Sequence, residues 1–68
     1  PDASHHDEVI AEAQQFIQAN YSEVINFEEL AGNSQIAYRS LQRRFKQATG
    51  FSPLKYQQYI RVENAKLL

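Results

Sequence analysis

A chain of 68 residues, 43% of them hydrophobic, with a net charge of −1 allows one small domain with a thin core. It contains no cysteine, which excludes disulfides and thiolate zinc sites as supports for the fold. No apolar run reaches the roughly 18 residues of a membrane span, and no signal-peptide pattern is present, so we expect a cytoplasmic protein without membrane contact. The opening Pro1-Asp2-Ala3-Ser4 lacks an initiating Met, and we interpret residues 1–6 as the remnant of a linker in a longer chain.

The first predicted helix lies between Asp7 and Tyr21. Ser4, with Asp7 three residues later, is the expected N-cap, and Asn20-Tyr21-Ser22 is the expected end. One apolar stripe at a period of 3.6 residues is expected to face the core, and it consists of Val9, Ile10, Ala13, Phe16 and Ile17.

A second, short helix is predicted to begin after Asn26, because Asn26 followed by Glu29 resembles a capping box. Its inward residues are expected to be Phe27, Leu30 and Ala31. The segment from Gly32 to Ala37 is the expected turn, since Gly32-Asn33 weakens helical propensity. Within that turn, Ile36 requires an apolar contact.

A third helix is predicted from about Tyr38 to Thr49, closed by Gly50, the residue that best adopts the left-handed conformation after a helix. Its buried stripe is expected to be Tyr38, Leu41, Phe45 and Ala48, and its opposite stripe Arg39, Gln42, Arg43 and Lys46. Arg44 lies on the flank. A structural role, with its stem packed or its charge paired with Glu63, and a phosphate contact are both open for it.

The dipeptide Ser52-Pro53 combines an N-cap with a proline at the first helical position, and it predicts a fourth helix that runs to the end of the chain. One stripe of this helix should dock on the first three helices, and it consists of Tyr56, Tyr59, Ile60 and Leu67. A weaker second stripe consists of Leu54, Ala65 and Leu68, interrupted by Arg61, for which we find no evident partner. Two apolar sides indicate that something packs on each side.

Charge is separated along the chain. All seven basic residues lie in residues 38–68, with Glu63 as the one acid there, whereas residues 1–37 hold seven acids and no Lys or Arg. The basic residues are Arg39, Arg43, Arg44, Lys46, Lys55, Arg61 and Lys66. This separation favours a surface that faces a polyanion, and it also allows the two halves to attract each other.

Several strings occur at fixed spacing: Asn26-Phe-Glu-Glu-Leu-Ala31, Ser40-Leu-Gln-Arg-Arg-Phe-Lys46, Thr49-Gly-Phe-Ser-Pro53 and Arg61-Val-Glu-Asn-Ala-Lys-Leu-Leu68. Together they resemble the DNA-binding region of AraC/XylS-type transcription regulators over roughly Val9 to Leu68. The spacing Leu41-x-x-x-Phe45-x-x-x-Thr49-Gly50-x-Ser52-Pro53, followed by Tyr56 and Arg61, makes the resemblance more specific than a bare helix-turn-helix pattern.

The resemblance implies an all-α fold in which two homeodomain-like helix-turn-helix lobes are joined by one long helix. Residues 7–50 would form the first lobe and residues 51–68 the connecting helix, which leads to a missing second lobe that the stripe of Leu54 would face. The resemblance also implies an effector-sensing domain upstream and contact with RNA polymerase. Gln35 stands where the family usually has a turn glycine, and Ala37 where it usually has a Ser N-cap, so Ser34 is a candidate cap for an earlier helix start.

The third helix has the side chains that major-groove recognition requires. A recognition helix reads bases with side chains of its N-terminal half, and Arg can pair with guanine and Gln with adenine. We therefore predict base contacts for Arg39, Gln42 and Arg43, positions that also contact bases in the family. Lys46 is predicted to contact a phosphate of double-stranded DNA, as are Lys55 and Arg61 on the fourth helix.

Other classes of function find little support. His5-His6 are adjacent and have no third ligand at metal spacing, no nucleophile has a base partner, and no glycine-rich phosphate loop occurs. We therefore expect no enzyme activity, no metal and no cofactor. The alternative that remains is a helical protein-interaction module whose basic helix binds an acidic partner.

Overall fold

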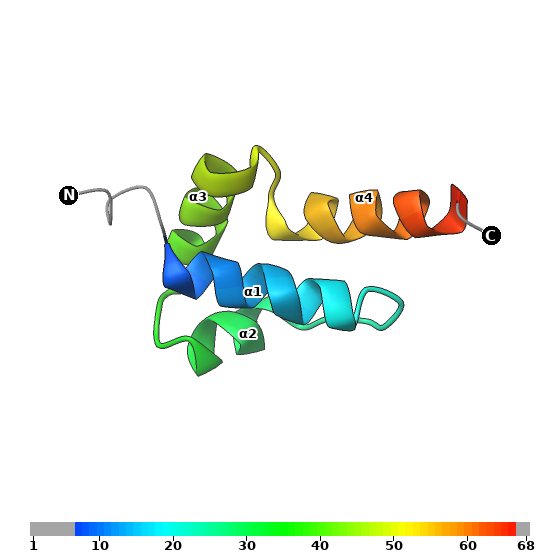
Figure 1. The fold of residues 1–68 in the computed structure, drawn as a ribbon. Helices are drawn as coiled ribbons and strands as arrows, with labels where there is room; N and C mark the ends of the chain where they lie inside the picture. Colours follow the sequence, from blue (N-terminus) through cyan, green and yellow to red (C-terminus); the bar gives the residue numbers. More distant parts are fainter. Residues whose placement is uncertain (1–6, 67–68) are drawn as a thin grey trace.

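The computed structural model describes residues 7–66, and four α-helices follow one another along this range (Figure 1). They are α1 (Glu8–Ala19), α2 (Phe27–Asn33), α3 (Tyr38–Thr49) and α4 (Pro53–Lys66). No strand occurs in the described range, so the all-α class is confirmed. None of these helices is long and apolar enough to cross a membrane.

The start of α1 differs from the prediction. Its N-cap is Asp7, whose Oδ1 accepts a hydrogen bond from the backbone N–H of Ile10 at 3.4 Å. The prediction that Ser4 caps α1 was wrong. Asp is as good an N-cap as Ser, and Asp7 directly precedes the first helical residue. Ser4 itself lies outside the described residues. The predicted end is confirmed, since Asn20 is the C-cap and its backbone N–H donates to the carbonyl oxygens of Phe16 and Ile17.

The predicted cap of α2 is confirmed, because Asn26 Oδ1 accepts from the backbone N–H of Glu29 at 3.0 Å. The helix nevertheless continues through Gly32 and Asn33, so the turn is shorter than predicted. Glycine costs a helix about 1 kcal/mol, and the burial of Leu30 and Ala31 on the same helix outweighs that cost.

The turn between α2 and α3 has an uncommon backbone conformation at Gln35, whose φ of 63° lies in the left-handed region. Ala37 is the N-cap of α3 and provides no side-chain hydrogen bond. Ser34 caps the C-terminus of α2 and does not start α3, so the suggested earlier start was wrong. The backbone N–H of Ile36 donates to the Ala31 carbonyl at 3.1 Å, which ties the turn to α2 and delays α3 until Tyr38.

The predicted limits of α3 and the start of α4 are confirmed. Gly50 closes α3 with a φ of 84°, and its N–H donates to the Lys46 carbonyl at 2.8 Å. Ser52 Oγ then accepts from the backbone N–H of Lys55 at 3.3 Å, and Pro53 is the first residue of α4.

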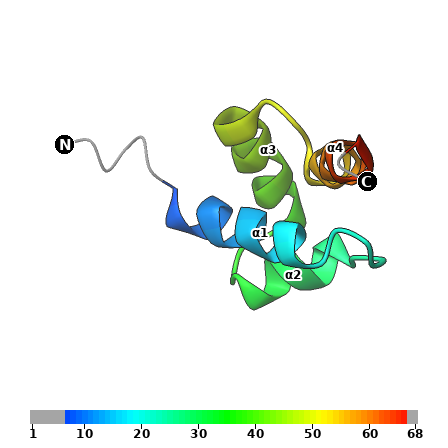
Figure 2. The same cartoon turned by 45° about the vertical axis from the view of Figure 1, so that its right-hand side comes forward.

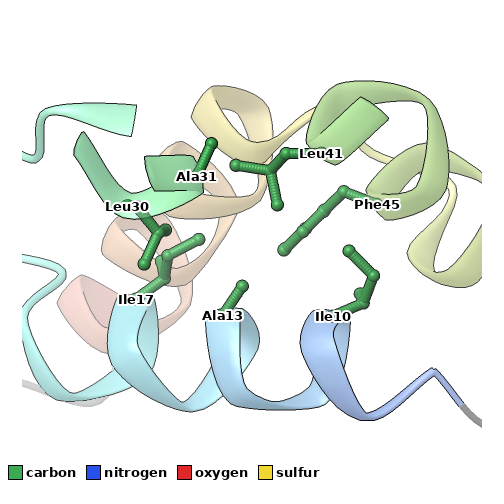
Figure 3. Packing of buried hydrophobic residues seen from close by; sticks show 7 residues of the cluster. All are labelled: Ile10, Ala13, Ile17, Leu30, Ala31, Leu41 and Phe45. Carbon is green, nitrogen blue, oxygen red and sulfur yellow. The ribbon is translucent and has the colours of Figure 1, made fainter. Parts of the chain in front are cut away.

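The core lies between α1 on one side and α2 and α3 on the other (Figure 3). Its buried members are Ile10, Ala13 and Ile17 of α1, Leu30 and Ala31 of α2, and Leu41 and Phe45 of α3. Partly buried side chains pack around this cluster, and Ile36 finds its apolar contact among them: Ile25, Phe27, Ile36, Tyr56 and Ile60. Burial of such apolar side chains contributes about 1.5 to 3 kcal/mol each.

Four apolar residues expected in the core lie at the surface: Phe16, Tyr38, Ala48 and Tyr59. The C-terminal end of α3 stands clear of α1, which leaves Ala48 exposed (Figure 2). Tyr59 stacks on Phe51 with ring centroids 5.3 Å apart, so its apolar partner lies outside the core. In the second stripe of α4, Leu54 and Ala65 are exposed. Leu68 of that stripe and Leu67 of the docking stripe lie outside the described residues.

Two polar side chains fasten α4 to the loop between α1 and α2. Gln57 is 4% exposed, and its Nε2 donates to the carbonyl oxygens of Tyr21 at 3.0 Å and Glu23 at 2.7 Å. Arg61 Nε donates to the same Tyr21 oxygen at 2.7 Å, and its NH2 donates to Glu23 at 3.4 Å. The expectation that Arg61 has no evident partner was therefore wrong, because its partners are backbone atoms that no sequence pattern displays.

Candidate nucleic-acid interface

The outer face of α3 is determined by what its inner face buries. Leu41 and Phe45 are fully buried, so residues displaced from them around the helix point to solvent. The exposed stripe recurs at intervals of three and four residues and consists of Arg39, Gln42, Arg43 and Lys46. All four are exposed, as the sequence predicts, and α3 carries no acidic residue to oppose their charge.

This basic stripe borders a shallow, open depression on the surface. Its lining residues are Arg39, Gln42, Arg43, Lys46, Gln47 and Ser52. Ser52 contributes from the turn before α4, so the depression extends from the basic stripe of α3 toward the first turn of α4. The structure therefore brings together the three predicted base-reading residues and the nearest predicted phosphate contact.

The two other predicted phosphate contacts lie apart from this depression. Lys55 is exposed in the first turn of α4 and does not line it. Arg61 lies two turns further along α4, where its guanidinium group donates to the loop carbonyls of Tyr21 and Glu23. The phosphate role of both residues remains a prediction, and Arg61 has a structural role in addition.

Tyr38 contacts one member of the stripe directly. Gln42 Nε2 donates a hydrogen bond of 3.2 Å to the hydroxyl oxygen of Tyr38, one turn earlier on α3. The Tyr38 side chain is 36% exposed, so this pair lies at the surface of the helix. The core role expected for Tyr38 is replaced by a contact with Gln42.

Arg44 ties α3 to the beginning of α1. Its NH2 and Nε lie 2.7 and 2.8 Å from the two carboxylate oxygens of Asp7, which is a bidentate ion pair. Arg44 therefore has a structural role, as considered from the sequence. Its paired carboxylate is Asp7 and not the expected Glu63. The hydrogen bonds from Arg44 lower the pKa of Asp7 below its ordinary value of 3.8, against the opposing effect of burial.

No group of three or more potential metal-ligating side chains occurs in the range 7–66. The pair His5-His6 considered in the sequence lies outside that range. The outer face of α3 offers guanidinium, amide and ammonium groups, and these recognise anions and hydrogen-bonding edges.

Three residues that line or position these elements were not predicted from the sequence: Gln47, Asp7 and Gln57. Gln47 follows Arg43 by four residues, and this helical spacing could have placed it beside the stripe. Asp7 and Gln57 gave no comparable signal, because each acts on a partner 34 or more residues away. Such contacts depend on how helices cross, which local patterns do not encode.

The chain is similar in sequence to two known proteins that carry the same name. No family model and no solved structure matches the chain. Over 51 residues, or 75% of its length, the chain is 37% identical to the "HTH-type transcriptional activator RhaS" of Pectobacterium carotovorum, and equally to the protein of that name from Pectobacterium atrosepticum. The matched region spans 18% of the length of each relative. Together with the four helices, this similarity supports an AraC-type helix-turn-helix region.

Proposed function

We propose that the chain is a sequence-specific DNA-binding region of a transcription regulator and that α3 is its recognition helix. The observation that carries the proposal is the division of α3 into two faces. Leu41 and Phe45 are buried in the core, while Arg39, Gln42 and Arg43 are exposed on the opposite side. Such a helix can enter a major groove, which is about 12 Å wide, without exposing its apolar side.

The exposed groups match the chemistry of base edges. A guanidinium can donate two parallel hydrogen bonds to O6 and N7 of guanine, and a glutamine amide can pair with N6 and N7 of adenine. Arg39, Gln42 and Arg43 therefore supply direct readout, while Lys46 binds a backbone phosphate. Lys55 is exposed for the same purpose, and Arg61 retains N–H donors beyond those that bind the loop.

The wider architecture belongs to the same proposal, because the matched region spans 18% of each relative. Residues 7–50 form the first lobe, and α4 leads to a second lobe. An effector-sensing domain lies upstream, and the regulator contacts RNA polymerase in the cytoplasm. The names of the relatives support the regulatory class, and the exposed face of α3 supports the DNA contact.

The central test is Arg43→Ala, compared with Arg43→Lys, in the complete regulator. Selection of bound sequences from random duplex DNA first defines the preferred site, and fluorescence anisotropy then measures affinity. Arg43→Ala should cost about 1 to 3 kcal/mol of binding free energy and relax the preference at one base pair. Arg43→Lys keeps the charge but loses the paired hydrogen bonds, so it should retain non-specific affinity while relaxing the same base pair.

The location of the contact can be tested with the 68-residue chain itself. Titration with a mixed duplex at low salt should shift the backbone NMR resonances of α3 more than those of α1 and α2. If Arg43→Ala keeps full affinity and the same preferred site, the role assigned to Arg43 is wrong. If polyglutamate competes as well as duplex DNA and selection yields no preferred site, the acidic-partner alternative replaces the proposal.

A further inference from the structure

We infer that Tyr38 is a positioning residue that holds the amide of Gln42 for adenine recognition. The inference rests on the proposed function of α3. The contact that carries it is the 3.2 Å hydrogen bond from Gln42 Nε2 to the Tyr38 hydroxyl oxygen. Tyr38 is thus a residue of the recognition face, although its aromatic character predicts a core position.

The hydrogen bond leaves the groups that adenine requires available. An amide nitrogen carries two hydrogens, and Tyr38 accepts one of them. The second N–H and the carbonyl oxygen Oε1 remain, and these are the donor and the acceptor that pair with N7 and N6 of adenine. Tyr38 therefore restrains Gln42 without consuming its recognition capacity.

The restraint reduces the conformational entropy that the Gln42 side chain loses when it binds a base. A glutamine side chain loses considerable rotamer freedom when it is held in one conformation, and a hydrogen bond already present in the free protein reduces what is lost on binding. The two residues are one helical turn apart, so the rigid backbone of α3 sets their separation. Tyr38 contributes no positive charge to the surface. Its effect is therefore on base preference and not on the general affinity for the polyanion.

The test is Tyr38→Phe in the complete regulator, because the substitution removes only the hydroxyl oxygen. The preferred adenine site is compared with duplexes that carry each other base pair at that position. Tyr38→Phe should reduce the preference about 2- to 10-fold, as expected for the loss of one neutral hydrogen bond. Affinity for an unrelated duplex should remain unchanged.

A double-mutant cycle with Gln42→Ala separates positioning from direct contact. If Tyr38 acts through Gln42, Tyr38→Phe has no further effect on base preference in the Gln42→Ala background. Tyr59→Phe is the matched control, because Tyr59 lies on α4, where it is half-exposed and stacked on Phe51. That control should leave both preference and affinity unchanged.

Two results would overturn the inference. An unchanged base preference in Tyr38→Phe would show that Gln42 reads DNA without help. A uniform loss of affinity for all duplexes, also present in the Gln42→Ala background, would show that Tyr38 binds a phosphate directly. The failure of the unmodified regulator to prefer any sequence would be a different result, because it would contradict the proposed function itself.

Discussion

Asp7 performs two tasks with one carboxylate. Its Oδ1 caps α1 through the backbone N–H of Ile10, and both oxygens accept hydrogen bonds from Arg44 of α3. The first task fixes where α1 begins, and the second fixes α3 against that point. The orientation of the exposed basic stripe of α3 thus depends on a residue that precedes the first helix.

Replacing Asp7 by Asn should separate these tasks, because Asn is an equally good N-cap but carries no charge. The lowered pKa of Asp7 means that the ion pair contributes stability above the ordinary value of 3.8 and loses it as the pH falls through the still lower folded-state pKa. We expect Asp7→Asn to reduce the free energy of unfolding by about 0.5 to 1 kcal/mol at pH 6, because the pair is partly exposed. As the pH falls below 3.8, the difference from the unmodified chain should shrink.

Urea unfolding at pH 6 and at pH 2.5 measures this difference. Glu12→Gln removes a carboxylate from the exposed side of α1 and serves as the control for net charge. A difference between Asp7→Asn and the unmodified chain that is equally large at both pH values would argue against an ionic contribution from Asp7.

At the scale of elements, α4 is held by a polar contact as well as by apolar packing. Tyr56 and Ile60 pack on the core, and the Tyr56 ring meets Phe45 edge to face at 5.2 Å. Beside them Gln57 is buried with its amide nitrogen on two loop carbonyl oxygens. A buried side-chain amide requires hydrogen-bond partners, so the pairing of Gln57 with these two carbonyl oxygens sets the register of α4 on the loop between α1 and α2.

The substitution Gln57→Glu should weaken this attachment, because it replaces the donating amide by a carboxylate of similar size. A carboxylate that faces two carbonyl oxygens repels them and is itself costly to bury. We expect a loss of about 1 to 3 kcal/mol in the free energy of unfolding at pH 7, measured by urea denaturation. Gln58→Glu, at the next and exposed position of α4, should change stability by less than about 0.5 kcal/mol. Equal losses in the two variants would contradict the buried role of Gln57.

At the scale of the whole molecule, the charge separation along the sequence becomes a separation between elements. α1 and α2 carry acids and no cations, whereas α3 carries cations and no acids. A polyanion is therefore attracted toward α3 and repelled from the opposite helices, which favours one docking orientation.

For the isolated 68-residue chain we expect weak and salt-dependent binding to duplex DNA, because one lobe offers few phosphate contacts and the net charge is −1. If Lys46, Lys55 and Arg61 each contact a phosphate, the slope of log affinity against log salt should be roughly −3. Lys46→Ala should reduce its magnitude by about 1. Fluorescence anisotropy over a series of salt concentrations measures the slope, and tight binding that ignores salt would contradict this expectation.

Local signals in the sequence determined the helices and the two faces of α3. The capping residues Asn26 and Ser52, the closing Gly50 and the spacing of Leu41 and Phe45 act within a few residues, so their effects can be read without the fold. The exposed stripe of Arg39, Gln42 and Arg43 follows directly from that spacing.

The tertiary structure alone decided which distant groups meet. Arg44 donates hydrogen bonds to Asp7, which lies 37 residues earlier in the chain, and Arg61 donates to the carbonyl oxygen of Tyr21, which lies 40 residues earlier. The ring of Tyr59 stacks on Phe51 outside the core, although the position of Tyr59 on α4 predicts burial. The physical reason is that periodicity encodes which side of a helix is apolar, whereas the distance and angle at which helices cross decide which side chains reach a partner.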